Sequence, residues 1–595
     1  MTFEATQPTL IGRVRHVLGA TITAELHPNV AGTTPLYRGR VYQIGQVGSL
    51  VCIPRASLLL VGSVSMIGIA ELLPPSQPAI IPQQGERWIQ FQLMGEIDGE
   101  GRFSRGVSHY PGIDDPVHFA TQEQFRTIYP REGEGHLRLG TLAAARGDPL
   151  FIDLGKLVVR HGAIVGSTGS GKSSTVATLV QGVLAAGFNR ANVVIIDPHG
   201  EHSTALGTSA AVLSISGTGA TALSVPYWAL SLDELIQVYS RGAERNPVTR
   251  NRLQELVLAE RQEFLRAAKW PVPPADDITV DSPVPFDLRK VWYRLDFDNR
   301  ATYDQANGRG PVCVEDPGDA CSLTPARFEA YALGSARPFK GPTLGHYSPL
   351  PDRLRVRLTD PRFSFLCRAW PAPAEPDPLP ECINLWLGGT APVSILDFSG
   401  APSEAADVAV GAILNLLFVA AANSSSSEGI GRSRPVLIIL EEAHRFLGKS
   451  SATTGLAREA AERIAKEGRK YGVGLLLVSQ RPSELSDTVL SQCGTIMAMR
   501  LTNESDQGAV RSTLPDASAA LANILPSLRT GEVLVSGEAI SLPARVVVDR
   551  PNPEPHAADP PISAWRGNSA VNDVRAAINR WRGAVKLGPE SKEAN

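Results

Sequence analysis

The residues of this sequence that are best suited to chemistry form a glycine-rich run that ends in lysine and serine. The run is Gly166, Ser167, Thr168, Gly169, Ser170, Gly171, Lys172, Ser173 and Ser174. It fits the pattern G-x-x-x-x-G-K-[ST], and we expect an apolar strand before it, over residues 163–165, and a helix after it. In that setting backbone N–H groups and the helix N-terminus surround phosphate oxygens, Lys172 reaches the β- and γ-phosphates, and the Ser173 hydroxyl ligates Mg²⁺. The run therefore predicts a binding site for ATP and Mg²⁺.

Two adjacent acids follow a second apolar run. Residues 436–440 read VLIIL, and Glu441 and Glu442 come directly after them. Either carboxylate could hold Mg²⁺, usually through its water shell, and we assign that role to Glu441. Glu442 is then placed to polarise the attacking water. Two acids at the solvated end of a strand need no function by themselves, but together with the phosphate loop they predict hydrolysis of ATP.

Two more polar residues end apolar runs. Asp197 follows residues 193–196, and consecutive strands of such a sheet tend to be neighbours, which predicts that Asp197 lies beside the phosphate loop. There it would join the Mg²⁺ shell or hold Lys172 in place, unless it only caps the turn that follows. Gln480 follows the run 475–479 and suits a sensor of the γ-phosphate or of the attacking water, unless it is a plain strand end.

Two arginines are candidates for stabilising transition-state charge from a neighbouring subunit. Arg469 ends the helix expected over residues 456–470, where a basic residue is an ordinary partner of the helix dipole. In a ring of NTPase subunits, however, the helix after the paired acids often faces the next subunit. Arg160 lies twelve residues before Lys172, on the strand expected before the loop, and is the second candidate. An arginine at a strand start is otherwise usually solvated.

A sheet must position these residues. From residue 158 onwards apolar strand runs alternate with helical segments, and several strands are apolar at nearly every position, as strands buried on both faces need. The predicted fold class is α/β, with a P-loop ATPase core built on a parallel sheet. Residues 10–73 read as short strands punctuated by glycine and proline, which indicates a small β-barrel.

The predicted division of the chain follows from these patterns. The barrel occupies residues 1–80, the ATPase core 81–229 and 386–550, a helical and loop-rich insertion 230–385, and a C-terminal extension 551–595. Lys172 and Glu442 belong to one site yet stand 270 positions apart, far more than a minimal P-loop core needs. The insertion therefore lies within the core.

Composition excludes several classes of protein. The 595 residues favour about three to four domains. The net charge is −3, so a surface that coats nucleic acid is excluded and any such contact must be local, as in a lined channel. The six cysteines form no CxxC or Cys/His cluster, which argues against a zinc site. No signal-peptide pattern opens the sequence and no apolar run reaches about 18 to 20 residues, so we expect a cytoplasmic protein without membrane contact.

Several motifs occur in an order that resembles the HerA family of hexameric DNA translocase ATPases, which is related to FtsK. They are GSTGSGKSS (166–174), IIDPHGEH (195–202), LIILEEAHRFL (437–447), EGRKYG (467–472), LVSQRPSEL (477–485) and GEVLVSGEAISLPARV (531–546). The resemblance implies that the barrel helps to assemble a six-membered ring and that the RecA-like domains surround a pore for double-stranded DNA. It also implies that a nuclease or another effector docks on the ring. Residues 271–380 match nothing in this pattern.

The leading hypothesis is an ATP-driven translocase or helicase that acts on double-stranded DNA as a homo-oligomer, a hexamer by resemblance. Its effector would be a NurA-type nuclease in DNA end processing, or a sirtuin-like NAD-consuming enzyme or another nuclease in antiphage defence. Residues 448–455 would form a pore loop in which Lys449 meets a DNA phosphate, unless they are an ordinary loop. The alternatives are an ATP-switched ring that organises and activates a partner enzyme, and a conjugative or secretion ATPase, which usually carries membrane segments.

Overall fold

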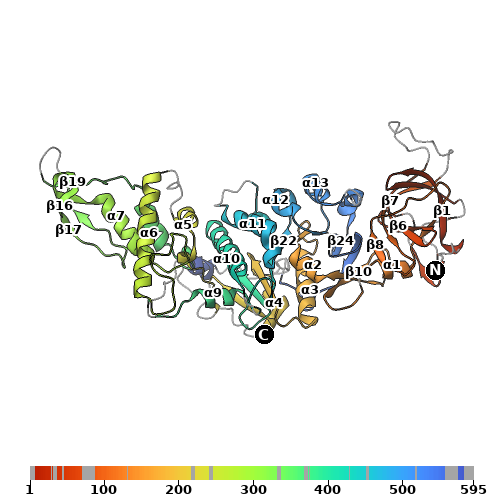
Figure 1. The fold of residues 1–595 in the computed structure, drawn as a ribbon, viewed down its shortest axis with the longest axis horizontal. Helices are drawn as coiled ribbons and strands as arrows, with labels where there is room; N and C mark the ends of the chain where they lie inside the picture. Colours follow the sequence, from red (N-terminus) through yellow and green to blue (C-terminus); the bar gives the residue numbers. More distant parts are fainter. Residues whose placement is uncertain are drawn as a thin grey trace.

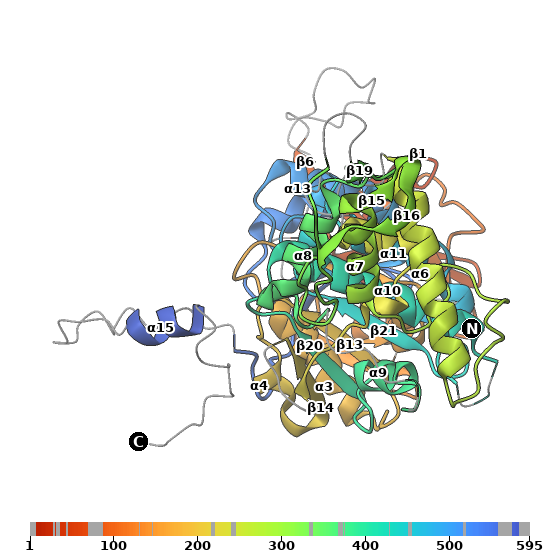
Figure 2. The same cartoon turned by 90° about the vertical axis from the view of Figure 1, so that its left-hand side faces the viewer.

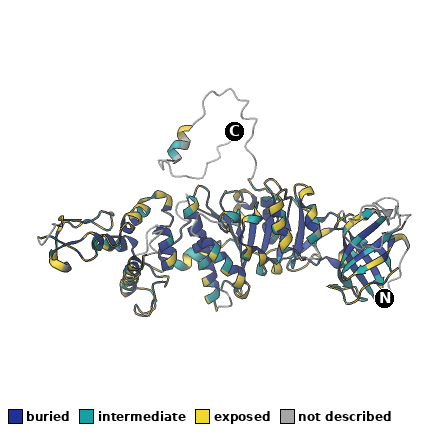
Figure 3. Ribbon diagram, turned by 90° about the horizontal axis from the view of Figure 1, so that it is seen from above, coloured by how far each residue is buried: buried dark blue, intermediate teal, exposed yellow. Residues whose placement is uncertain are grey.

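The computed structural model arranges the chain as an elongated molecule with a β-barrel at one end, an α/β core in the middle and the insertion at the other end (Figure 1). It describes residues 7–27, 30, 36–42, 44, 46–69, 87–129, 131–145, 147–215, 221–239, 246–331, 337–366, 373, 375–425, 427, 429–449, 455–515, 519–556 and 574–581. Buried residues concentrate inside the barrel and along the central sheet (Figure 3).

The N-terminal barrel is one antiparallel sheet that closes on itself, because β2 pairs with both β1 and β7. Its strands are β1 (Leu10–Leu18), β2 (Thr21–Leu26), β5 (Leu50–Arg55), β6 (Leu58–Ile69), β7 (Arg87–Ile97), β8 (Phe103–Arg105) and β9 (Pro116–Phe119). Alternate residues of β7 are buried, as a packed barrel interior requires.

The barrel boundary predicted at residue 80 is wrong. Strands β7 and β9 lie beyond it, and β7 pairs with β6 along almost its whole length. The proline-rich run 74–78 reads locally as a linker between domains, whereas β6 and β7, the strands on either side of that run, pair within one barrel. The core sheet begins only with β10 (His136–Leu142).

The core is an eleven-stranded sheet in the order β11-β10-β25-β24-β23-β12-β22-β21-β13-β20-β14. From β23 to β14 every neighbouring pair is parallel, while β24, β25, β10 and β11 extend one side with antiparallel strands. The remaining strands are β11 (Pro149–Asp153), β12 (Gly162–Val165), β13 (Asn192–Asp197), β14 (Ala210–Ser214), β20 (Val393–Asp397), β21 (Val436–Leu440), β22 (Val473–Ser479), β23 (Thr495–Ala498), β24 (Glu532–Gly537) and β25 (Ala544–Val548). The predicted α/β class with a barrel is confirmed.

Helices cover both faces of this sheet. On one face α10 (Ser403–Asn423) and α11 (Leu456–Tyr471) pack on one set of strand residues, and α3 (Lys172–Ala185) packs on the alternate set from the other face (Figure 1). Among the described residues, only α10 is long and apolar enough to cross a membrane, and 78% of its most apolar window is buried in the fold. Its place between the sheet and α11 accounts for that composition.

The insertion leaves the sheet after β14 and returns to β20, in front of the core as seen in Figure 2. Its helices are α5 (Leu232–Tyr239), α6 (Pro247–Ala267), α7 (Leu288–Arg300), α8 (Leu350–Thr359) and α9 (Leu379–Trp386). Their apolar faces share one core with α10. The fully buried Arg261 of α6 donates to the carbonyls of Trp228, Leu230, Val280 and Ser282, so its guanidinium ties three segments of the insertion together.

One glycine of the sheet tests this packing. A Cβ on Gly474 of β22 would lie 1.6 Å from the Val158 carbonyl oxygen, whereas a Cβ on Gly508 of α13 (Glu504–Thr513) would meet nothing within 4 Å. We predict that Gly474→Ala destabilises the fold by about 1–3 kcal/mol or prevents folding. Gly508→Ala should stabilise it by roughly 0.5–1 kcal/mol, because alanine is the better helix former. The unfolding midpoints of the two variants, measured by calorimetry, compare the same glycine-to-alanine change at a crowded and at an open position. Equal midpoints would contradict the prediction.

Candidate nucleotide-binding site

The glycine-rich loop joins β12 to α3 at the carboxyl end of the parallel sheet. Gly169 and Gly171 have φ values of 71° and 108°, which side chains rarely adopt, so these two positions require glycine. A Cβ on Gly171 would also lie 3.1 Å from the Met499 side chain. The loop can therefore turn its backbone N–H groups around a phosphate at the N-terminus of α3.

Neighbouring strand ends hold the loop from behind. The anchors are the Gly166 N–H to the Ser479 carbonyl (3.2 Å), the Ser167 N–H to the Arg500 carbonyl (2.8 Å) and the Gly531 N–H to the Ser170 carbonyl (2.9 Å). Ser479 ends β22, and Arg500 follows β23, so both strands that flank β12 support the loop. The phosphate cradle is thus set by the sheet.

Lys172 lies in the first turn of α3 with only 9% of its surface exposed. Its Nζ donates to the Ser167 carbonyl at 3.3 Å. Burial lowers the pKa of the ammonium below its usual value, and the charges of Glu442, Glu441 and Glu201 oppose part of that shift. A bound phosphate would add negative charge beside Lys172 and favour its charged form.

Two of the predicted Mg²⁺ ligands, Ser173 and Glu441, come together near Lys172. The Ser173 Oγ donates to Glu201 Oε2 at 2.9 Å, and Glu441 Oε1 accepts from His202 Nε2 at 2.7 Å. A hydroxyl and carboxylates are the oxygen ligands that suit Mg²⁺. In the described part of the chain no three His, Cys, Asp or Glu side chains could hold a metal by themselves. The residues therefore fit an ion that arrives with nucleotide phosphates and keeps several waters.

Asp197 caps the turn that follows β13, which is one of the roles left open for it. Its two carboxylate oxygens accept the backbone N–H groups of His199, Gly200 and His202. The prediction that Asp197 lies beside the loop is wrong, because β22 and β21 stand between β12 and β13. Instead, the turn that Asp197 stabilises brings Glu201 to Ser173, a contact that sequence reasoning missed. The sequence offered one signal for this contact: an acid that could cap a turn, Asp197, followed four residues later by a second acid, Glu201.

Glu442 follows β21 with a left-handed backbone, φ 48° and ψ 45°, which costs roughly 1–3 kcal/mol for a residue with a side chain. Its Oε2 lies 3.2 Å from His444 Nδ1, and that nitrogen lies 3.3 Å from the Ser479 hydroxyl. Burial lowers the pKa of His444 despite the opposing charge of Glu442. Strained backbone of this kind is common at functional sites, and here it places the predicted base beside Lys172.

Gln480 contacts the phosphate loop directly, since its Oε1 accepts from the Thr168 hydroxyl at 2.7 Å. A sensor of the γ-phosphate must have such access to the loop, so the geometry favours this role over that of a plain strand end. The structure thus gathers Lys172, Ser173, Glu441, Glu442 and Gln480 at one end of the sheet.

The two candidate arginines lie at the other end of the sheet. Arg160 is the C-cap of α2 (Leu154–Val159), not part of a strand as predicted, and pairs with Glu538 at 3.0 Å. Arg469 is exposed in the last turn of α11, just before β22 begins. Both precede the amino ends of adjacent strands, so neither can reach the site of its own chain. Arg500 follows β23 beside the loop, an arginine on the nucleotide side that sequence reasoning missed.

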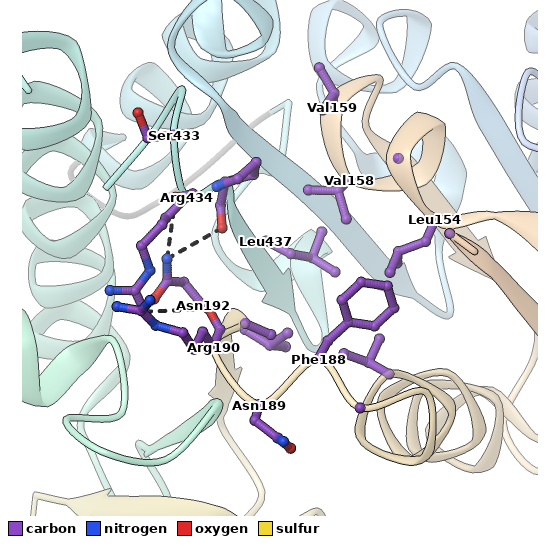
Figure 4. Close-up of a pocket in the computed structure, with 17 residues that line it drawn as sticks. Leu154, Val158, Val159, Phe188, Asn189, Arg190, Asn192, Ser433, Arg434 and Leu437 are labelled. Carbon is purple, nitrogen blue, oxygen red and sulfur yellow. Dashed lines mark hydrogen bonds between the residues drawn. The ribbon is translucent and has the colours of Figure 1, made fainter. Parts of the chain in front are cut away.

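A cavity of about 730 Å³ also opens at the amino end of the sheet (Figure 4). Leu154, Val158, Phe188 and Leu437 line it, with Arg434 on its rim. It offers neither a glycine loop nor acids for a metal, so the nucleotide site lies elsewhere. The predicted pore loop, residues 448–455, falls largely outside the described residues, and the described Lys449 pairs with Asp487 at 2.8 Å.

The glycine loop, the paired acids of β21, and a sheet in which β22 separates β21 from β12 define a P-loop ATPase with a RecA-like core. Residues 137–417 match the family profile described as Helicase HerA, central domain. Residues 425–554 match the profile described as Helicase HerA-like C-terminal. The chain belongs to the HerA helicase family and is an ATPase of that family.

Similarity to named relatives extends over most of the chain. It is similar to a probable helicase of Methanocaldococcus jannaschii, 27% identical over 469 residues that cover 78% of this chain and 76% of the relative. It is also similar to the DNA double-strand break repair helicase HerA of Sulfurisphaera tokodaii, 25% identical over 477 residues, 79% and 80% of the two chains. Among solved structures, VirB4 of Thermoanaerobacter pseudethanolicus aligns with a TM-score of 0.45 and 15% identity, covering 71% of this chain and 98% of that one.

Charge-neutral replacement of Glu442 tests its assignment. We predict that Glu442→Gln binds ATP as the wild type does but hydrolyses it roughly 10²–10⁴-fold more slowly, because the attacking water loses its base. Lys172→Ala should lose binding itself. The same exchange at the exposed Glu123 of α1 (Gln122–Ile128) is the matched control and should change neither quantity. Equal hydrolysis by Glu442→Gln and Glu123→Gln would remove Glu442 from the mechanism.

Proposed function

We propose that this chain is an ATP-driven translocase or helicase for double-stranded DNA that works as a hexameric ring in the cytoplasm. The observation that carries the proposal is the complete hydrolytic set at one end of the sheet, in a chain of a helicase family. Relatives of similar length are named DNA double-strand break repair helicases, which supports DNA as the substrate. The balanced charge supports a local contact with DNA, as in a pore.

A ring is supported by the placement of the arginines. Arg160 and Arg469 lie at the amino end of the sheet, away from the nucleotide site of the same chain. In a ring joined head to tail, the amino end of one subunit's sheet faces the carboxyl end of the next subunit's sheet. Either arginine would then stabilise the phosphoryl charge that develops in the neighbour's site.

The chemistry follows from the residues gathered around Lys172. The loop N–H groups and Lys172 would hold the phosphates, and Ser173 and Glu441 would hold Mg²⁺, which would screen the phosphate charge. Glu442 takes up the proton of the attacking water, with His444 beside it. Gln480, bonded to Thr168 of the loop, responds to loss of the γ-phosphate.

The partner we propose is an effector enzyme docked on the ring. A NurA-type nuclease would place the motor in DNA end processing, and a sirtuin-like NAD-consuming enzyme would place it in antiphage defence. Mass determination of the complex that co-purifies with the tagged full chain identifies the partner and the number of subunits. A chain that purifies alone as a monomer would contradict both parts of the proposal.

The motor proposal is tested with blunt duplex DNA. We expect the duplex to raise the ATPase rate of the wild type several-fold, and we expect ATP-dependent displacement of a third strand from a DNA triplex; Lys172→Ala should show neither. If hydrolysis responds only to the partner enzyme and the triplex stays intact, the chain is an ATP-switched scaffold. If wild type and Lys172→Ala are equally inactive with duplex and partner present, the motor proposal fails.

Mixing subunits tests whether Arg469 acts on the neighbour. Arg469→Ala and Glu442→Gln should each be inactive alone. Mixed in equal amounts, they should recover activity at about a quarter of the interfaces, those that join an intact Glu442 to an intact Arg469. Lys466→Ala, on the same exposed face of α11, is the control and should stay active by itself. A mixture that remains inactive would leave Arg469 with a structural role only.

A further inference from the structure

Two consecutive residues of one turn contact Ser173 and Glu441, two of the three predicted metal ligands. Glu201 accepts the Ser173 hydroxyl at 2.9 Å, and His202 donates from Nε2 to Glu441 Oε1 at 2.7 Å. Ser173 belongs to α3 and Glu441 follows β21, and β22 separates the strands that lead to them. The turn after β13 therefore joins two halves of the metal site that have no direct strand pairing.

His202 is a buried histidine whose ring bonds to Glu441. Its side chain is fully buried, and the bond to Glu441 is the one side-chain hydrogen bond that the described structure gives it. The other ring nitrogen, Nδ1, is buried and has no partner among the described residues. A residue that only had to fill this volume could be apolar, because a buried nitrogen without a hydrogen bond costs stability. The imidazole is thus explained by what it does to Glu441.

The turn itself is held on both sides. Asp197 accepts the N–H groups of His199, Gly200 and His202, and Gly200 has a φ of 73° that favours glycine. The His556 N–H donates to the Glu201 carbonyl at 2.9 Å, which fixes the turn from the C-terminal segment as well. Backbone held this firmly gives the two side chains defined positions.

We propose that Glu201 and His202 are positioning residues for the Mg²⁺ site of the proposed ATP-binding function. Glu201 takes the hydrogen of the Ser173 hydroxyl and leaves the oxygen lone pairs for the ion. His202 holds one oxygen of Glu441 and leaves the other for the ion's water shell. Outer partners of this kind orient the groups that ligate a metal. The contacts with the metal site that the sequence pattern assigns to Asp197 are made here by Glu201 and His202, later in the same turn.

Mg²⁺ titration of nucleotide binding tests the proposal in the full-length protein. The probe is a fluorescent, non-hydrolysable ATP analogue, titrated with MgCl₂. We expect His202→Phe, which keeps a ring but no donor, to raise the Mg²⁺ concentration for half-maximal binding about 10–100-fold, the usual effect of losing an outer partner. His202→Gln, whose amide can donate from a position close to Nε2, should restore most of the affinity. Binding without Mg²⁺ should be unchanged in both.

A second variant and a control keep the test decisive. Glu201→Met, at a partly exposed position, should also weaken Mg²⁺ if His202→Phe does not fold. His118→Phe is the matched control, since His118 is also buried and its side chain has one hydrogen bond in the described structure, to Thr9 in the barrel at 2.9 Å. Wild-type Mg²⁺ dependence in folded His202→Phe or in Glu201→Met would overturn the proposal. The measurement needs neither DNA nor hydrolysis. The positioning proposal can therefore fail while the motor proposal holds, and the motor proposal can fail while the positioning proposal holds.

Discussion

Parallel pairing of four adjacent strands is the constraint on which the whole site depends. The register sets Val165 of β12 opposite Ser479 of β22, and Ile196 of β13 opposite Leu440 of β21. The residues that follow these positions leave the sheet together, because parallel strands end on the same side. The glycine loop, Gln480, Glu441 and the turn after Asp197 meet there, although they come from four separate parts of the chain. A one-residue shift in any pairing would turn a buried strand residue toward the site in place of a polar one.

The insertion and the barrel both attach to the core outside these four strands. The insertion leaves from β14 and returns to β20, which are the last two strands of the sheet, so its length does not disturb the strands that carry the loop and the acids. The barrel attaches on the opposite side, where Arg105 donates to the carbonyls of Gly537, the last residue of β24, and of Ile540 and Ser541. Large accessory regions can therefore be added at both sides of one fixed ATPase centre.

What the sequence could predict follows from how local each signal is. The glycine loop, the paired acids and Gln480 are recognisable because each motif includes the strand end that presents it. Asp197 was placed beside the loop wrongly because strand order is a property of the whole sheet. Strands β21 and β22, which begin at Val436 and Val473, enter between β12 and β13. The barrel boundary failed for the same reason, since β7 closes the barrel by distant pairing. The contacts of Glu201 and His202 depend on which turn meets which strand end, and no local pattern states that.

One strand, β22, runs from the end of the sheet that carries Arg469 to the end that carries Gln480. β22 begins two residues after Tyr471, just beyond Arg469, and ends at Ser479, which is followed by Gln480. Every residue of β22 is buried, and β12 and β21 pair with it on either side, so it moves only with the sheet. In the proposed ring, Gln480 meets the nucleotide of its own subunit and Arg469 meets that of the neighbour. A change at the phosphate loop that shifts Gln480 is then carried along β22 to the arginine end, about 23 Å away at the usual rise per residue. In the proposed ring, the sheet that assembles each site is thus also a direct physical link between successive sites.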